Sequence, residues 1–172
     1  ELYERRLDAA RVTKGTSSSV IYRLLVKTAL RTIDLGADVL EFGAGTGSLV
    51  KMLRAAGFTG RITAADILPR PEDVDAGTSW IERDLNEPLP LADRAFDAII
   101  STEVIEHLEN PRSVFREFGR LLRPGGVLVL TTPNQESLRS LLSLLLRGHY
   151  VDFLDSSYPA HITALVRRDF VR

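Results

Sequence analysis

The stretch VLEFGAGTG, residues 39–47, decides how the rest of the chain is interpreted. Its first half completes a buried apolar run over 37–42 that is typical of a strand, and its last glycine opens a helix predicted over 47–57. Glycine lets the backbone turn tightly and lets a ligand approach it closely. The start of a helix also presents free amides to an anionic group. One glycine suffices for a strand-to-helix turn, so three in this setting favour a cofactor-binding loop.

Strands and helices alternate beyond this loop. Four further apolar runs have the length and composition of strands: 61–66, 79–84, 95–102 and 125–133. Two further segments have helical spacing, 21–33 and 111–122. Such alternation is typical of a parallel sheet covered by helices on both faces. We therefore expect an α/β fold, a Rossmann-like three-layer sandwich with a mostly parallel central sheet, whose ligands bind beyond the carboxyl ends of its strands.

The length of 172 residues fits a single domain over 1–172. Within it we predict a helical cap over 1–36, broken near 13–19, a cofactor-binding core over 37–134, and an insert over 135–160 that covers a substrate pocket. The sequence begins at a glutamate rather than a methionine, so we expect it to be trimmed at its start.

The composition is ordinary for a globular protein, 44% hydrophobic and 26% charged. The net charge of −1 argues against a general nucleic-acid footprint. Cysteine is absent, which excludes disulfides, thiolate metal sites and a cysteine nucleophile and fits a cytoplasmic location. No apolar run approaches the roughly 20 residues that span a membrane, so we expect no membrane span.

The spacing of the loop narrows the choice of cofactor. The dinucleotide fingerprint G-x-G-x-x-G/A would place its third small residue at Ser48, and no G-K-[ST] follows to make a Walker loop. Asp66 ends the second predicted strand 23 residues beyond Gly43, where a carboxylate can bind ribose hydroxyls. The residues therefore predict a nucleoside ligand. A dinucleotide-dependent oxidoreductase stays as an alternative that Ser48 disfavours.

The loop also resembles motif I of the class I S-adenosylmethionine (SAM)-dependent methyltransferases, in which an acidic residue precedes G-x-G-x-G. RDLNEPLPLADRAFDAII (83–100) is similar to the family's run from third to fourth strand, and LLRPGGVLVLTTPN (121–134) to its helix, turn and fifth strand. The resemblance covers 37–134 and implies a SAM-binding core with S-adenosylhomocysteine (SAH) as product. It also implies a final antiparallel hairpin, which we expect to be missing because the sequence stops at Arg172.

The resemblance assigns roles to residues at the predicted strand ends. Glu41 is placed near the methionyl end of the cofactor, Asp66 at the ribose and Asp84 at the adenine edge, with Ser101 and Thr102 beneath the sulfonium. Taken alone, Asp66 would also fit a strand-end cap, and Asp84 a solvated acid in a polar loop. The full implied cofactor set is Glu41, Gly43, Ala44, Gly45, Gly47, Asp66, Ile67, Asp84, Leu85, Ser101 and Thr102.

EVIEHL, residues 103–108, follows the fourth predicted strand. On a helix its two glutamates and its histidine share a face, and carboxylates suit a helix's first turn. Two chemical interpretations compete with that structural one. His107, with Glu106, is a candidate acid/base catalyst for methyl transfer to oxygen. Alternatively, a divalent cation would activate the acceptor hydroxyl. Its candidate ligands within the segment are Glu103, Glu106 and His107, and a resemblance to one methyltransferase branch adds the later His161.

EVIEHL further resembles a stretch in two methyltransferase branches. One is the bacterial small-RNA 3′-terminal 2′-O-methyltransferases, which bind metal there with a later histidine; the other is the ubiquinone-pathway O-methyltransferases. The RNA enzymes carry a His-rich run after the fifth strand, where 135–160 has only His149. We therefore predict transfer of a methyl group to a small-molecule acceptor, first to an oxygen, with no nucleic-acid partner and no metal assigned. A metal-dependent RNA methyltransferase and a non-catalytic SAM-binding scaffold stay as alternatives.

SLRSLLSLLLRGHYVDF, residues 137–153, carries a broad apolar stripe at helical spacing: Leu138, Leu141, Leu142, Leu145 and Leu146. We expect a helix packed on the sheet, with a lid over an apolar substrate or a dimer face as alternatives. The aromatic candidates for lining a pocket are Tyr150, Phe153 and Tyr158. The sequence predicts no particular oligomeric state.

Overall fold

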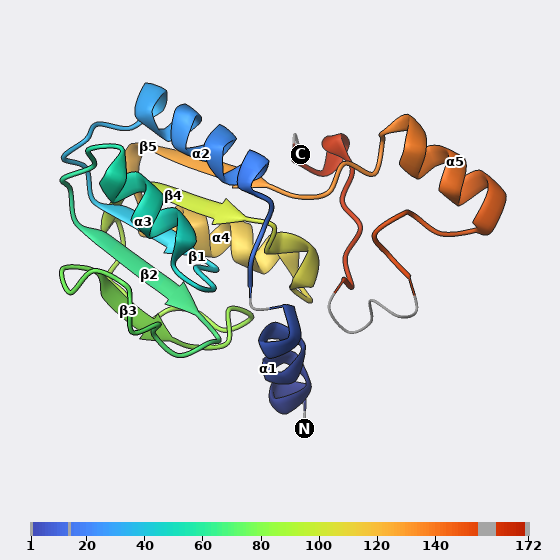
Figure 1. Ribbon diagram of the computed structural model, residues 1–172, viewed down its shortest axis with the longest axis horizontal. Helices are drawn as coiled ribbons and strands as arrows, with labels where there is room; N and C mark the ends of the chain where they lie inside the picture. Colours follow the sequence, from blue (N-terminus) through green and yellow to red (C-terminus); the bar gives the residue numbers. More distant parts are fainter. Residues whose placement is uncertain (1, 14, 155–160, 171–172) are drawn as a thin grey trace.

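The computed structural model describes residues 2–13, 15–154 and 161–170. Its centre is a sheet of five parallel strands in the order β3-β2-β1-β4-β5 (Figure 1). The strands are β1 Val39–Phe42, β2 Ile62–Asp66, β3 Ser79–Glu82, β4 Phe96–Thr102 and β5 Leu122–Thr131. The chain runs outward from β1 through β2 and β3, then returns to add β4 and β5 on the other side. Open α/β sheets bind ligands at this reversal, beyond the carboxyl ends of β1 and β4.

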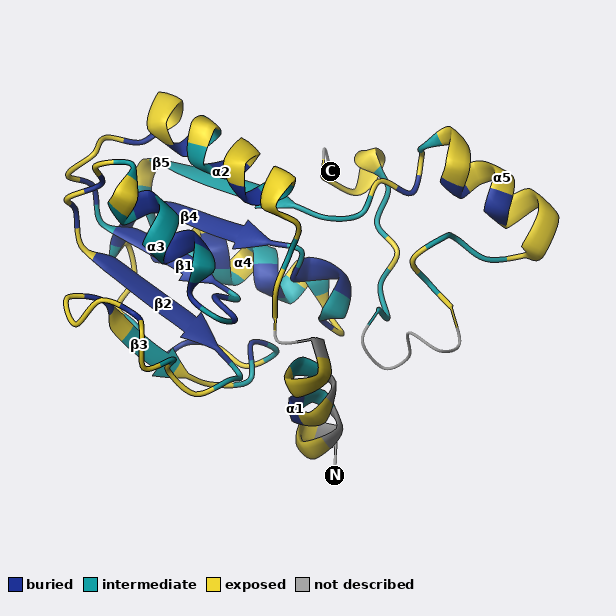
Figure 2. Ribbon diagram, viewed as in Figure 1, coloured by how far each residue is buried: buried dark blue, intermediate teal, exposed yellow. Residues whose placement is uncertain are grey.

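Helices cover both faces of the sheet, which confirms the predicted three-layer α/β sandwich. α2 (Ser19–Thr32) and α3 (Ser48–Ala55) pack their apolar side chains on one face, in a cluster that includes Leu25 and Leu49. α4 (Pro111–Leu121) packs on the other face, where the Phe118 ring meets the Phe42 ring edge-on, with centroids 4.9 Å apart. Figure 2 shows that β1, β2 and β4 are buried between these partly exposed helices, whereas the edge strands β3 and β5 are more exposed.

β1 is buried along its whole length because both of its faces are covered. Its side chains alternate, as in any strand. Leu40 and Phe42 belong to the cluster under α4, whereas Val39 belongs to the cluster under α2 and α3. Glu41 therefore points toward α2 and α3 and is only 2% exposed. A carboxyl group so deeply buried in the central strand needs a specific environment, because desolvation disfavours its charged form.

The N-terminal helix α1 (Leu2–Thr13) lies beyond the carboxyl ends of the strands and apart from the three layers (Figure 1). The predicted break near 13–19 is confirmed, since α2 begins at Ser19 and its Ser18 side chain accepts a hydrogen bond from the Ile21 amide. Ser, Thr, Asp and Asn are the preferred residues at such a cap. α1 is thus a separate piece placed over the edge of the sheet where ligands bind.

The EVIEHL segment does not form the α-helical turn that would align its acidic residues. Only Ile105–His107 forms a single turn of 3-10 helix, η1. Glu103 precedes it with a φ of +53°, a left-handed conformation that is uncommon for a residue with a side chain. The prediction of a shared helix face for Glu103 and Glu106 is therefore wrong.

α5 (Leu138–Arg147) is a helix as predicted, but its leucines do not pack on the sheet. Leu138, Leu145 and Leu146 are between 74% and 79% exposed, whereas the buried side chains of this helix are Ser140 and Ser143. Figure 1 shows α5 standing away from the sheet. The expected packing is wrong because the spacing of leucines predicts a helix but does not say what the helix contacts.

The described C-terminal part ends in a short 3-10 helix, η3 Arg167–Phe170. No strand follows β5 within the described ranges, so β5 is an edge of the sheet there. None of the helices described in 2–13, 15–154 and 161–170 is both long and apolar enough to cross a membrane.

Candidate active site

A pocket of about 290 Å³ lies at the carboxyl edge of the sheet, at the reversal of strand order. Its wall combines the glycine loop, the ends of β2 and β4, the loop after β3, the EVIEHL segment, α1 and the linker to α2. The lining residues are Arg6, Ala10, Gly15, Thr16, Ser17, Gly43, Asp66, Ile67, Asp84, Leu85, Asn86, Thr102, Glu103, Val104, Glu106, His107, Leu108 and His161. Six separate regions of the sequence therefore meet at one cavity: 6–17, 43, 66–67, 84–86, 102–108 and 161.

The glycine loop needs glycine for two reasons at once. Gly43 and Gly45 have φ values of +85° and +50°, which residues with a side chain rarely adopt. A Cβ at Gly43 would collide with the Val104 side chain, and a Cβ at Gly45 would collide with the carbonyl oxygen of Gly15. The loop is thus held between the EVIEHL segment and the α1–α2 linker, and it presents bare backbone to the pocket.

Asp66 ends β2 and braces the loop. One carboxylate oxygen accepts a hydrogen bond from the Gly45 amide at 2.6 Å, and the other accepts one from the Leu68 amide at 2.8 Å. Burial raises the pKa of Asp66, although these amide hydrogen bonds oppose the rise. Asp66 is therefore a strand-end cap and also lines the pocket. Its contact with a ribose stays a prediction.

Glu41 lies on β1, just before the glycine loop, and does not line the pocket. Its Oε2 atom is buried and has no hydrogen-bond partner among the described residues. Burial raises the pKa of Glu41 well above its ordinary value, and repulsion from Asp66 adds to the rise. Burial raises the pKa of the Tyr22 phenol on α2. The nearby charges of Glu41 and Asp66 raise it further.

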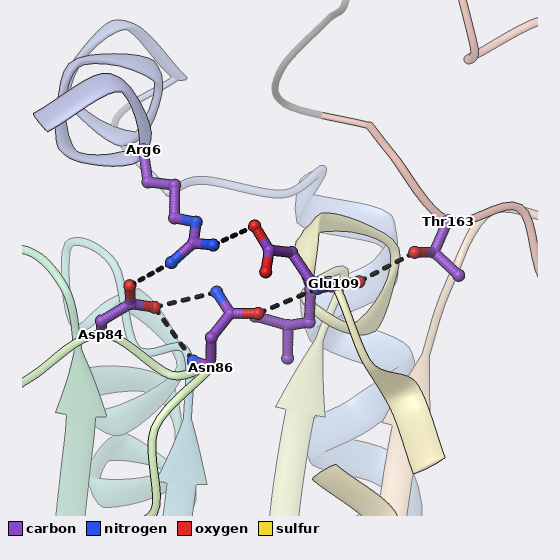
Figure 3. A network of polar contacts seen from close by, with 6 residues as sticks. Arg6, Asp84, Asn86, Glu109 and Thr163 are labelled. Atoms are coloured by element: carbon purple, nitrogen blue, oxygen red, sulfur yellow. Dashed lines mark hydrogen bonds and ion pairs between the residues drawn. The ribbon is translucent and has the colours of Figure 1, made fainter. Parts of the chain in front are cut away.

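Asp84, in the loop after β3, is the centre of a polar network (Figure 3). Its Oδ1 atom accepts hydrogen bonds from the amide and the side chain of Asn86, at 3.0 and 2.9 Å. Its Oδ2 atom pairs with the guanidinium of Arg6, whose other arm reaches Glu109. Burial works to raise the pKa of Asp84, but Asn86 and Arg6 outweigh it and hold the pKa below its ordinary value. Asp84 is therefore ionised.

The EVIEHL segment contributes a buried carboxyl group to the pocket. Glu106 has no solvent exposure, its Oε2 atom accepts a hydrogen bond from Thr132, and its Oε1 atom has no partner in the described part of the chain. Burial raises its pKa to about 8, and the nearby charge of Glu103 adds to the rise. Buried polar atoms are nearly always hydrogen-bonded, so an unpartnered carboxyl oxygen in a pocket points to a ligand.

Two histidines complete this end of the pocket. The centroids of the His107 and His161 rings lie 4.8 Å apart. One ring nitrogen of each histidine and one carboxylate oxygen of Glu106 also lie within 4.8 Å of one another. The segment carrying His161 is fixed here because the Ile162 and Thr163 amides both donate to the Glu106 carbonyl at 3.0 Å. The Nδ1 atom of His161 contacts the Asp152 carbonyl, which can only accept a hydrogen bond. A neutral ring that donates from Nδ1 carries its available lone pair on Nε2.

The family follows from comparison with known proteins. A family model described as a methyltransferase domain matches residues 18–170. The chain belongs to the methyltransferase domain family. The fold agrees: a proposed methyltransferase from Bacillus halodurans superimposes with a TM-score of 0.63 at 19% identity over 86% of this chain and 64% of its own.

Two further proteins of named activity are similar to this chain. A ubiquinone biosynthesis O-methyltransferase of Xanthomonas oryzae is 30% identical over 151 residues, 77% of this chain and 61% of its own length. A Burkholderia thailandensis N1-methyltransferase solved with SAH and 1,6-didemethyltoxoflavin superimposes with a TM-score of 0.55 at 20% identity, over 64% of this chain and 51% of its own. This methyltransferase domain spans less than two thirds of the length of either relative.

The predicted cofactor residues divide into two groups. The pocket wall contains Gly43, Asp66, Ile67, Asp84, Leu85 and Thr102. The others lie behind that wall: Glu41, Ala44, Gly45, Gly47 and Ser101. Each of the candidate acceptor-side residues named from sequence lines the pocket: Glu103, Glu106, His107 and His161. Tyr150 and Phe153 do not line it, although the Phe153 ring lies 5.4 Å from the His161 ring. Tyr158 lies outside the described residues.

Sequence reasoning missed the N-terminal contribution. Arg6, Ala10 and the linker residues Gly15 to Ser17 line the pocket, yet the segment 1–36 was predicted only as a helical cap. Nothing in the local pattern marks Arg6, because its two carboxylate partners lie 78 and 103 residues away. Gly15, between the two predicted helices, was the available sign of a close approach. In the structure it lies against Gly45.

Proposed function

We propose that this domain binds SAM and transfers its methyl group to an oxygen atom of a small molecule. The observation that carries the proposal is one cavity with two unlike ends. One end is a glycine loop braced by Asp66 with ionised Asp84 beyond it, and the other is the buried Glu106 with two histidines. The O-methyltransferase relative from Xanthomonas supports the choice of oxygen. SAM supplies an electrophilic methyl group when bound.

The chain's residues would act by positioning and by accepting a proton. The acceptor hydroxyl would lie against His107, and SAM, when bound, would supply the electrophilic methyl group and be left as SAH. The hydroxyl proton passes to the imidazole of His107, whose ordinary pKa suits a base near neutral pH. The carboxyl group of Glu106, once ionised, stabilises the imidazolium that results. Holding the two reactants in line would supply much of the rate enhancement.

A divalent cation is a second candidate at the acceptor end. The residues fit one: the buried Oε1 atom of Glu106 lacks a partner in the described structure, and two imidazoles stand within reach of it. His161 already directs Nδ1 to a backbone carbonyl, the arrangement that orients many metal-binding histidines. Glu106, His107 and His161 would hold the ion, with Glu103 as a further candidate. When bound, a cation would lower the pKa of the acceptor hydroxyl.

The acceptor itself is proposed by class only. The segment 135–160 borders the acceptor end through Asp152 and Phe153, which contact His161, and this supports its proposed role at the substrate pocket. An RNA acceptor fits less well, because the net charge of −1 provides no general attraction for phosphate. A cytoplasmic location is proposed on the cysteine-free composition alone.

The test is transfer of a radiolabelled methyl group from SAM to a panel of catechols, carboxylic acids and single-stranded RNA ends, in EDTA and in Mn²⁺. We expect labelling of a small hydroxyl or carboxyl compound, lost by about 10²-fold or more in His107→Ala. His149→Ala is the matched control, because His149 lies outside the pocket wall and contacts the Tyr150 carbonyl. SAH binding without transfer to any acceptor would favour a scaffold, and labelling of RNA alone would favour the RNA alternative.

A further inference from the structure

α1 forms part of the pocket wall, and few of its described side chains are buried. Among its described side chains only Leu7 is buried, while Tyr3 and Val12 are exposed. Arg6 and Ala10 are half-buried and line the pocket. A helix attached by so little apolar surface is expected at the low end of local stability. The polar contacts of Arg6 therefore carry much of its attachment.

Arg6 ties α1 to two different loops. One guanidinium nitrogen pairs with Asp84, after β3, and the other with Glu109, after η1. These loops are themselves joined, because the Asn86 side chain donates to Asp84 at 2.9 Å and accepts from the Glu109 amide at 2.9 Å. The four residues form a closed ring of polar contacts (Figure 3). Arg6, Asp84 and Asn86 of this ring line the pocket, so the arginine joins α1 to the pocket wall.

The linker after α1 adds a second contact on the same side. The carbonyl oxygen of Gly15 lies against the α-carbon of Gly45, close enough to exclude any side chain there. The Ser17 amide donates to the Tyr22 hydroxyl at 3.0 Å, which fixes the linker to α2. Arg6 and Ala10 of α1 and residues 15–17 of the linker thus line the same pocket as Gly43 and Asp84. A nucleoside bound beneath this wall could not leave by that side while the wall stays in place.

We propose that α1 is a lid over the cofactor end of the pocket and that Arg6 is its latch. Exchange of SAM and SAH would require the Arg6 contacts with Asp84 and Glu109 to break and α1 to swing outward. The inference rests on the proposed cofactor function. Arg6 is a positioning residue in this account, because it acts on the lid and not on the transferred methyl group. Asp84 would contact the adenine edge on one side, while Arg6 holds its carboxylate on the other.

Glu109 gives the sharpest test because it does not line the pocket. The release rate of SAH is measured by stopped-flow competition for wild type, Arg6→Gln, Glu109→Gln and the double variant. We expect release to be about tenfold faster in Arg6→Gln and about threefold faster in Glu109→Gln, the scale of a partly exposed ion pair. The double variant should be no faster than Arg6→Gln, since both changes remove the same latch. Arg11→Gln is the control, because Arg11 is exposed and its ion pair among the described residues is with Asp8 on the same helix.

Two further readouts separate a latch from a direct ligand contact. Salt should speed release from wild type more than from Arg6→Gln, because it screens the exposed Glu109 arm. Amide exchange in α1, measured without ligand, should rise in Arg6→Gln and stay unchanged in Arg11→Gln. If Glu109→Gln is silent while Arg6→Gln alone weakens binding, Arg6 contacts the ligand and the latch is wrong. If wild type does not bind SAH, the proposed function fails first and the latch with it.

Discussion

The two ends of the pocket are built in different ways. At the cofactor end, backbone amides hold the buried carboxylate that braces the glycine loop: Asp66 accepts from the Gly45 and Leu68 amides. At the acceptor end, Glu106 keeps an unpartnered buried oxygen within the described residues and Glu103 holds a left-handed conformation. Strain and unsatisfied polar atoms tend to gather where a ligand acts. The difference teaches that the first end is preformed, whereas the second depends on what it binds.

The largest expected effect is at the preformed end. Gly45→Ala places a Cβ against the Gly15 carbonyl at a φ of +50°, so the loop must move. We expect SAH affinity to fall by about 100-fold or more, because a shift of about 1 Å in a positioned site is that costly. Calorimetric titration of SAH measures it.

Gly57→Ala is the matched control for that change. Gly57 has a φ of +93° at the end of α3, but a Cβ there meets no atom within 4 Å. It should lower the free energy of unfolding by about 1 kcal/mol and leave SAH affinity unchanged. Equal losses of affinity in both variants would contradict a preformed loop.

The buried Glu106 predicts a pH dependence of stability at the other end. Its pKa is about 8 in the folded protein against 4.5 ordinarily, so between these values the folded state binds more protons than the unfolded state. Glu106 should therefore lower the free energy of unfolding as pH rises from about 4.5 to about 8, by at most about 1.4 kcal/mol per unit, and its own contribution should level off above. Urea unfolding in EDTA at several pH values measures the slope.

Glu106→Gln should flatten that slope, since the amide does not titrate. It should also make the protein more stable than wild type at pH 8, where the buried carboxylate of wild type is half ionised. Glu136→Gln, on an exposed glutamate, is the control. A wild-type slope that survives in Glu106→Gln would assign it to other buried acids, such as Glu41.

A smaller effect distinguishes a metal site from an acid/base pair. If the cluster binds Mn²⁺, an ion at 100 times its dissociation constant should raise the free energy of unfolding by about 2.7 kcal/mol. The gain should vanish in His161→Ala and persist in His149→Ala, as measured by urea unfolding at pH 7.5. No gain in wild type at millimolar Mn²⁺ would leave His107 as the base.

The smallest expected effect is on α5, and α3 provides the contrast. Leu53 on α3 has no exposure, so Leu53→Ala should cost about 2–5 kcal/mol of stability. Leu145 on α5 is 79% exposed, so Leu145→Ala should change stability by less than about 0.5 kcal/mol. Thermal and urea unfolding of both variants measure the difference. A large loss from Leu145→Ala would mean that α5 is covered by another surface in solution.

The sheet could be predicted from sequence because its signals are local. Buried runs such as VLEF, and glycines at strand ends, mark each unit of the fold within a few residues. The site was only partly predictable. Asp66 follows from its place at a strand end, whereas His161 was named because of a family resemblance. Arg6 was missed because a contact between residues 78 positions apart produces no periodic pattern in the sequence.

Two errors have the same physical origin. The helix face expected for Glu103 failed because its backbone bends before η1, where the chain leaves β4. The packing expected for α5 failed because apolar spacing fixes a face but not its partner. In both cases tertiary contacts overrode the local preference that the sequence pattern indicates.

Calorimetric titration of SAH into the wild-type protein in EDTA tests the central claim most directly. The account predicts binding of one SAH per chain, because the cofactor end is preformed and needs no metal. Addition of Mn²⁺ should leave the SAH affinity unchanged, since the acceptor end is separate. An absence of binding heat at two temperatures would contradict the assignment of this pocket to SAM.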